Sequence, residues 1–187
     1  MRVIAGQFRS RRLRSPAALR VRPTSDRLRE TLFNVLGPTV EDCLFFDLYA
    51  GTGAIGIEAI SRGAREVIFV ESHAKTAALI RENLAALGIG KGAEVIQDAA
   101  ARALDKLAAR HLLADFIFLD PPYNAPDEYE ETLEFLDTSH LVAPEGIVIA
   151  EHQRKIELPD RFVRLERTRL LEQGDAALSF YRRAAAA

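Results

Sequence analysis

The residues best suited to chemistry are the four consecutive residues Asp120-Pro121-Pro122-Tyr123. They follow the apolar run Phe116–Leu119, whose length and composition predict a buried strand. Two prolines cannot continue a central strand, so the chain must leave the sheet there. An acid and an aromatic ring are then presented at the carboxyl end of a strand, where open α/β sheets bind their ligands. The set suits the delivery of a methyl group to the exocyclic amine of a planar nucleobase.

Each member of this tetrapeptide has a role in such a reaction. The Asp120 carboxylate and the Pro121 carbonyl can accept both amine hydrogens, which orients the nitrogen lone pair. Asp120 also stabilises the positive charge that develops on the nitrogen. Tyr123 can stack on the base. The simpler interpretation is a turn that ends a strand and does no chemistry. We predict that the catalytic residues are Asp120, Pro121, Pro122 and Tyr123.

A second candidate site is the glycine pattern G-x-G-x-x-G formed by Gly51, Gly53 and Gly56. Glycines at this spacing allow a tight turn, close approach of a ligand to the backbone, and close packing of helix on strand. Glu71 ends the following strand, 20 positions after Gly51, where an acid can accept hydrogen bonds from ribose hydroxyls. Asp98 follows the third strand and either reaches an adenine amine or caps the next helix.

Asp47 decides among the cofactors that this pattern permits, which are NAD, FAD and S-adenosylmethionine. It precedes the first glycine by four residues, and its carboxylate would repel a pyrophosphate but attract the ammonium of a methionyl group. We therefore expect S-adenosylmethionine, with S-adenosylhomocysteine as the product. The expected cofactor-binding residues are Asp47, Tyr49, Gly51, Gly53, Glu71 and Asp98. The four histidines lack metal-ligand spacing, so we expect no metal.

The elements that must position these residues alternate between strand and helix. Strands are predicted at 43–49, 66–70, 93–97, 116–119 and 146–150, with helices at 54–62, 73–87, within 99–113 and near 128–136. A first helix starts at Thr24 or Ser25 and ends at Gly37-Pro38. Two further strands, 162–171 and 177–182, flank the turn Gln173-Gly174-Asp175. This order predicts an α/β fold with a mostly parallel sheet and an antiparallel hairpin at one edge.

Positive charge is concentrated at the N-terminus. Residues 1–30 contain nine arginines and carry a net charge of +7, whereas the whole chain carries −2. Such an arm either binds a polyanion or forms ion pairs with the acidic remainder of the chain. We predict a basic arm over residues 1–23, starting with a short hairpin, and a catalytic domain over residues 24–187. The candidate phosphate-binding residues are Arg9, Arg11, Arg12, Arg14, Arg20 and Arg22.

Length and composition agree with one cytoplasmic domain. A chain of 187 residues is long enough for one full core. The single cysteine, Cys43, rules out an internal disulfide. No apolar run approaches the roughly 20 residues that span a bilayer, and no signal peptide is visible, so we expect no membrane partner.

Several further segments complete a family resemblance. They are the opening 2–6, the segment 22–36, the segment 57–64 and the closing 174–181. With both motifs, they resemble the RsmD-type 16S ribosomal RNA guanine-N2 methyltransferases, which are class I S-adenosylmethionine-dependent enzymes. The resemblance covers nearly the whole chain, with one departure at Ser10, where the family pattern has glycine.

The resemblance implies more than the residues alone. It implies a Rossmann-like sheet of seven strands and methylation of the N2 amine of guanine 966. It also implies 16S ribosomal RNA within an assembled small-subunit particle as the partner. We expect a monomeric enzyme, with the arm as the RNA-binding extension.

Three rival interpretations remain open at this point. A DNA adenine or cytosine amino-methyltransferase would share both motifs, although such enzymes usually carry a target-recognition domain and no stretch here is long enough to be one. A non-catalytic RNA-binding assembly factor would share the fold. An NAD-dependent enzyme is disfavoured by Asp47.

Overall fold

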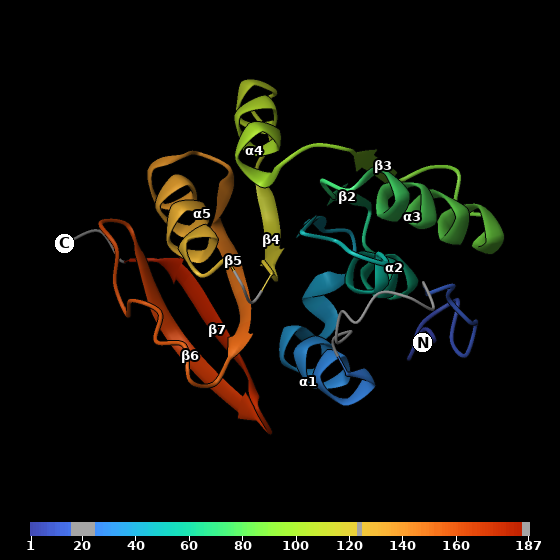
Figure 1. The fold of residues 1–187 in the computed structure, drawn as a ribbon, viewed down its shortest axis with the longest axis horizontal. Helices are drawn as coiled ribbons and strands as arrows, with labels where there is room; N and C mark the ends of the chain where they lie inside the picture. Colours follow the sequence, from blue (N-terminus) through green and yellow to red (C-terminus); the bar gives the residue numbers. More distant parts are fainter. Residues whose placement is uncertain (16–24, 123–124, 185–187) are drawn as a thin grey trace.

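A seven-stranded sheet forms the centre of the computed structural model, which describes residues 1–15, 25–122 and 125–184 (Figure 1). The strands are β1 (Leu44–Leu48), β2 (Glu66–Val70), β3 (Ala93–Ile96), β4 (Ala114–Leu119), β5 (Val142–Gln153), β6 (Leu165–Gln173) and β7 (Ala176–Arg183). The helices are α1 (Asp26–Leu36), a 3₁₀ turn (Gly37–Val40), α2 (Ala54–Ser61), α3 (Ala74–Leu87), α4 (Ala100–Ala109) and α5 (Asp127–Thr138). None of these helices is long and apolar enough to cross a membrane.

The strand order is β3-β2-β1-β4-β5-β7-β6. The first five strands are parallel, and β6 and β7 form an antiparallel hairpin that pairs with β5 through β7. The predicted fold class is therefore confirmed, and the fourth strand pairs with the first. Because the order reverses between β1 and β4, the carboxyl ends of these two strands define the switch point where such sheets bind ligands.

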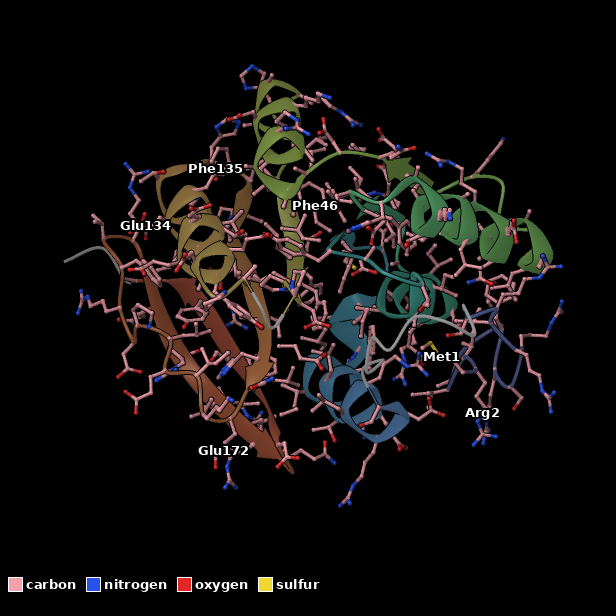
Figure 2. All side chains as sticks on the ribbon, viewed as in Figure 1. Met1, Arg2, Phe46, Glu134, Phe135 and Glu172 are labelled. Atoms are coloured by element: carbon pink, nitrogen blue, oxygen red, sulfur yellow. The ribbon has the colours of Figure 1, made fainter. Side chains whose placement is uncertain are left out.

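Alternating strand residues pack into two separate hydrophobic clusters, one on each face of the sheet. Phe45, Phe69 and Phe118 pack with apolar residues of α1, α2 and α3. Phe46, labelled in Figure 2, packs on the opposite face, where the cluster includes residues of α4 and α5. Side chains two positions apart in a strand share a face. An acid near the carboxyl end of a strand can therefore be assigned to one face.

Strand β5 is longer than the sequence predicted. Its first residues, from Val142, pair with Ala114, and the register then shifts so that Phe116 pairs with Ile147. Pro144, which lacks the N–H of a ladder hydrogen bond, is exposed within this irregularity. The prediction began the strand after this proline because a bulge that keeps the strand running on both sides depends on the partner strand.

The start of α1 agrees with the predicted capping. The Ser25 hydroxyl accepts a hydrogen bond from the Leu28 N–H at 3.1 Å. The alternative cap, Thr24, lies outside the described residues. Gly37 ends the helix with a φ of +60°. Phe33 of α1 stacks on Phe45 of β1 with 6.3 Å between ring centroids, which holds the helix on the α1–α3 face of the sheet.

The described part of the arm, residues 1–15, is a short hairpin packed on α2 and α3 (Figure 1). Arg2 and Arg12 form its bridge, and Val3 and Leu13 are buried in the core. Gly6 has a φ of +77°, and a Cβ there would lie 1.7 Å from the Ser61 carbonyl oxygen. Only glycine permits this approach of the arm to α2.

Buried charges also fasten the arm to the body. The Glu58 carboxylate, fully buried in α2, accepts hydrogen bonds from the backbone N–H groups of Ile4 and Ala5 at 2.7 and 3.0 Å. Arg29 of α1 is also fully buried and donates to the Arg2 carbonyl at 2.6 Å. Residues 1–15 are thus a docked layer of the core rather than a detached tail.

Candidate functional site

The glycine loop connects β1 to α2 and uses its three glycines in different ways. Gly51 and Gly53 have φ values of +55° and +76°, which favour glycine, and Gly53 is the N-terminal cap of α2. A Cβ at Gly56 would lie 2.3 Å from the Phe69 ring, so this glycine allows α2 to pack closely on β2. A Cβ at Gly51 would meet only the Tyr49 oxygen, at 3.9 Å, so the loop backbone is open to a ligand.

Asp47 lies beneath this loop and is 2 % exposed. Its carboxylate accepts a hydrogen bond from the Gly56 N–H at 2.8 Å. Burial raises the pKa of Asp47 to about 8, the Glu71 charge adds to the rise, and the Gly56 hydrogen bond opposes it. A cation placed beside Asp47 would favour the ionised carboxylate, so the position suits a positively charged ligand group.

Glu71 is hydrogen-bonded both to the glycine loop and to the segment that follows β2. One carboxylate oxygen accepts from the Gly51 N–H at 2.9 Å, and the other accepts from the His73 N–H at 2.8 Å. These bonds fix the carboxylate against the glycine loop at the end of β2. The predicted proximity of Glu71 and the loop is therefore present in the structure, while the contact with a ribose stays a prediction.

Asp98 and Tyr49 have partners within the protein. The Asp98 carboxylate pairs with Lys106 at 2.7 Å and with Arg102 at 2.6 Å, and these two hydrogen bonds lower the pKa of Asp98 to about 2. Asp98 also accepts from the Ala99 N–H at the start of α4. The Tyr49 hydroxyl lies 2.9 Å from the Thr132 hydroxyl of α5. Both residues stay predicted cofactor contacts, and ligand binding at Asp98 would have to compete with two ion pairs.

The tetrapeptide begins immediately after β4. Asp120 follows Leu119, Pro121 is buried, and Pro122 is exposed. Tyr123 lies outside the described residues. The Pro121 carbonyl accepts a long hydrogen bond, 3.5 Å, from the buried Tyr129 hydroxyl of α5. Its second lone pair leaves capacity to accept an amine hydrogen.

The pKa of Asp120 is strongly shifted by its surroundings. Burial raises its pKa well above the usual value for an aspartate, and the charges of Glu151 and then Asp47 raise it further. Strongly shifted carboxylates in a ligand-binding edge are typical of functional sites.

Four carboxylates therefore lie at the carboxyl ends of the parallel strands, on one face of the sheet. Each lies two positions after a residue that packs in the hydrophobic cluster with α1, α2 and α3. The four residues belong to four neighbouring strands. In β4 and β5 the partners Leu119 and Ala150 are followed directly by an acid on each strand. The four residues, in strand order, are Glu71, Asp47, Asp120 and Glu151.

Glu151 was not among the site residues predicted from the sequence. It is 3 % exposed and lies in β5 opposite Leu178 of β7. Its position in the alternation, two residues after Ile149, is the same as that of Asp120 after Phe118. That signal was present in the sequence, but it becomes meaningful only once the register of β5 against β4 is known.

The arm arginines fall into two groups. Arg11 donates to the Ala86 carbonyl at 3.2 Å, and Arg14 pairs with Glu82 at 2.9 Å, so both contact α3. Arg9 and Arg12 are exposed and have no ion pair within the described residues. Arg20 and Arg22 lie outside the described residues.

A groove of about 420 Å³ is lined by residues of both the arm and α1. Arg2, Arg9 and Arg27 line it together with Asp26 and Glu30. In the described ranges, no group of three or more His, Cys, Asp or Glu side chains could hold a metal ion.

Comparison with known proteins places this geometry in a family. The family model described as "Conserved hypothetical protein 95" matches residues 1–182. "Putative rRNA methyltransferase YlbH" of Bacillus subtilis is 37% identical over 183 residues, covering 98% of this chain and 99% of the relative. "Ribosomal RNA small subunit methyltransferase D" of Escherichia coli K12 is 36% identical over 159 residues, covering 85% of this chain and 78% of the relative.

A solved structure gives the same result. The structure titled "Putative methyltransferase yhhF from Escherichia coli" superimposes with a TM-score of 0.86 at 32% identity, covering 100% of this chain and 99% of the other. The resemblance to RsmD-type proteins, and with it the Rossmann-like fold, is confirmed.

Proposed function

The chain belongs to the family described as conserved hypothetical protein 95, and on that premise we propose that it methylates ribosomal RNA of the small subunit. The donor in this proposal is S-adenosylmethionine, and the acceptor is the exocyclic N2 amine of a guanine of the guanine-966 type in 16S ribosomal RNA. Relatives that carry the name of a small-subunit ribosomal RNA methyltransferase support the substrate class. We further propose that the natural substrate is an assembled small-subunit particle and that the enzyme acts as a monomer.

The observation that carries the proposal is the row of four carboxylates at the switch point. Asp47 and Glu71 adjoin the glycine loop, where an ammonium and a ribose diol fit and a pyrophosphate would be repelled. When bound, S-adenosylmethionine would supply an electrophilic methyl group on a positively charged sulfur. Burial of the carboxylates strengthens their attraction for such a cation, because water screens charges less in a buried site.

Asp120 and Pro121 hold the acceptor amine in this mechanism. The Asp120 carboxylate accepts one amine hydrogen and the Pro121 carbonyl accepts the other, so the nitrogen lone pair is directed away from both. As the new bond forms, positive charge develops on the nitrogen and the Asp120 carboxylate stabilises it. Asp120 then holds the proton that the nitrogen must lose. Tyr123, in the same proposal, stacks on the base.

Glu151 supports guanine over the other amino bases. Guanine carries a ring N–H donor, N1–H, directly beside its N2 amine, whereas the ring nitrogen beside the amine of adenine or cytosine is an acceptor. Asp120 and Glu151 stand side by side on β4 and β5. When both are ionised, two neighbouring carboxylates therefore match a donor-donor edge and oppose a donor-acceptor edge. A carboxylate has about four lone-pair positions, so Glu151 can accept from N1–H while keeping a contact inside the protein.

A substrate analogue tests this recognition. 2-Aminopurine keeps the N2 amine of guanine but has a lone pair at N1. In a target RNA with this replacement, we expect methyl transfer by the wild type to fall by about 10²-fold or more, since a site built for a hydrogen-bond donor rejects an analogue without it. Glu151→Gln should transfer more slowly to guanine and discriminate much less between the two bases. Equal discrimination by both proteins would refute the role of Glu151.

The function itself is tested by identifying the product. The protein is incubated with labelled S-adenosylmethionine and with small-subunit particles, bare 16S ribosomal RNA or DNA, and the nucleic acid is digested to nucleosides. We expect N2-methylguanosine from the ribosomal substrates. Methylated adenine or cytosine from DNA would favour the DNA enzyme, and RNA binding with no transfer to any substrate would favour the non-catalytic assembly factor.

A further inference from the structure

One buried amide connects the arm to the glycine loop. Asn83 of α3 is 1 % exposed, and its side chain makes three hydrogen bonds. Its oxygen accepts from the Arg14 N–H at 2.8 Å, and its nitrogen donates to the Arg14 carbonyl at 3.2 Å. The same nitrogen donates to the Thr52 carbonyl at 3.1 Å. Both donor hydrogens of the amide are therefore used, one toward each segment.

Thr52 is well placed to transmit an effect. It lies between Gly51 and Gly53, the two glycines whose positive φ values shape the loop. A displacement of its carbonyl must therefore change the backbone that faces the ligand. The hydroxyl of Thr52 also contacts the Met1 sulfur at 3.5 Å, so the first residue of the arm lies on the same loop residue. Figure 2 labels Met1 between the arm and α2.

We propose that Asn83 is a positioning residue that couples the RNA-binding arm to the cofactor loop. Binding of the cofactor at the loop orders the Thr52 carbonyl, and this carbonyl fixes the Asn83 amide. The Asn83 amide then fixes the backbone of Arg14 at the end of the hairpin. By thermodynamic linkage the effect is reciprocal, so RNA held by the arm favours cofactor binding to the same degree. The inference rests on the proposed function, because it takes the loop as the cofactor site and the arm as the RNA site.

The proposed coupling differs from a simpler expectation from sequence. The glycine loop, Glu71 and Asp98 all lie between residues 47 and 98, which predicts a cofactor site independent of the arm. In the structure, Met1 contacts Thr52 of the glycine loop directly, and Arg14 is connected to Thr52 through Asn83. Loss of the arm's docking is therefore expected to weaken cofactor binding.

Hydrogen exchange of the wild-type protein tests the coupling without RNA and without a variant. The Ile4, Ala5 and Gln7 amides donate to Glu58 and Ser61 of α2, so their exchange reports how firmly the arm is docked. Saturating S-adenosylhomocysteine should slow their exchange about fivefold or more, the lower end of typical couplings between sites. Binding of the ligand with unchanged exchange of these amides would overturn the coupling. A wild type that binds no S-adenosylhomocysteine would overturn the proposed function and the coupling with it.

Two variants identify Asn83 as the connection. Asn83→Ala removes all three hydrogen bonds, and Asn83→Asp keeps an acceptor for the Arg14 N–H but loses both donors. Each should bind S-adenosylhomocysteine about tenfold more weakly, and at saturation the ligand should no longer slow exchange in the arm. The matched control is Glu82→Ala, which removes the exposed ion pair to Arg14 and leaves the Asn83 bonds in place.

The control separates a specific connection from a loss of arm contacts in general. Glu82→Ala should change ligand affinity by less than about twofold and keep the ligand's effect on exchange, because exposed ion pairs contribute little. Folded Asn83 variants that keep the wild-type response, or a Glu82→Ala variant that loses it equally, would refute the assignment to Asn83. A parallel measurement of RNA affinity with and without S-adenosylhomocysteine should show the same difference between the proteins.

Discussion

Replacement of Glu71 by alanine is expected to damage the cofactor site in two measurable ways. The side chain is 7 % exposed and accepts backbone N–H groups of Gly51 and His73 at 2.9 and 2.8 Å. A hydrogen bond to a charged group contributes about 1.5–3 kcal/mol, and relief of repulsion with Asp47 offsets part of the loss. We therefore expect the free energy of unfolding to fall by about 2–3 kcal/mol. For a chain of this size the melting temperature should then fall by about 5–10 °C.

The second effect of Glu71→Ala is on ligand affinity. Loss of a charged contact to the ribose should weaken binding of S-adenosylhomocysteine by about 1–3 kcal/mol, or roughly 5- to 150-fold, in titration calorimetry. Glu71→Gln keeps one acceptor oxygen, so its affinity for the ligand should fall between that of the wild type and that of Glu71→Ala. Glu145→Ala, at a side chain that is 97% exposed, is the control and should match the wild type.

A ligand lacking the ribose 2′-hydroxyl separates the ribose contact from damage to the loop. Removal of the hydroxyl should cost the wild type affinity and should cost Glu71→Ala little, because the variant has no carboxylate to lose. Wild-type affinity in Glu71→Ala, or an equal cost of the missing hydroxyl in both proteins, would refute the assignment.

Three further predictions concern the acceptor site and the arm. Methyl transfer should rise with pH as Asp120 ionises. Glu151→Gln should move the midpoint of the rate–pH profile to lower pH, because the substitution removes a charge that raises the Asp120 pKa. An unmoved midpoint would contradict this. The double variant Arg9→Ala, Arg12→Ala should reduce the slope of log RNA affinity against log salt by about 1.4–1.8. The double variant Arg11→Ala, Arg14→Ala should reduce the slope less, since the Arg11 and Arg14 side chains already contact α3. Equal slopes for the two double variants would argue against this difference. Ser10→Gly should stabilise the protein by about 1 kcal/mol, because Ser10 has a φ of +67°, a left-handed backbone that is costly for a residue with a Cβ. A lower melting temperature in this variant would contradict the prediction.

Local patterns in the sequence were sufficient for most of the architecture. Apolar runs, glycine stops and the alternation of strand and helix placed every strand and helix within a few residues, and the order of elements predicted the parallel sheet with its hairpin. The glycine loop and Asp120 were predictable for the same reason, since strand ends and glycine spacing are local features. The left-handed backbone of Ser10 also agrees with the glycine that the family pattern has there.

Features that depend on long-range partners were not predictable. The position of Glu151 beside Asp120 depends on the register of β5 against β4. The ion pairs of Asp98 depend on side chains of α4. Docking of the arm uses Glu58 and Asn83, which are more than 50 positions away from their partners in the chain. Both residues read as ordinary polar positions in helices, and only the folded structure shows their hydrogen bonds.

The central claim is that the Asp120 carboxylate holds the acceptor amine while the methyl group is transferred. The most direct test is the single-turnover rate of N2-methylguanosine formation in small-subunit RNA, measured for the wild type and for Asp120→Asn at saturating S-adenosylmethionine. The amide is nearly isosteric and removes the negative charge, so the rate should fall by about 10²-fold or more, as for loss of one preorganised polar group. Affinity for S-adenosylhomocysteine should stay within about threefold, a difference of less than 1 kcal/mol. A wild-type rate in Asp120→Asn would contradict the account.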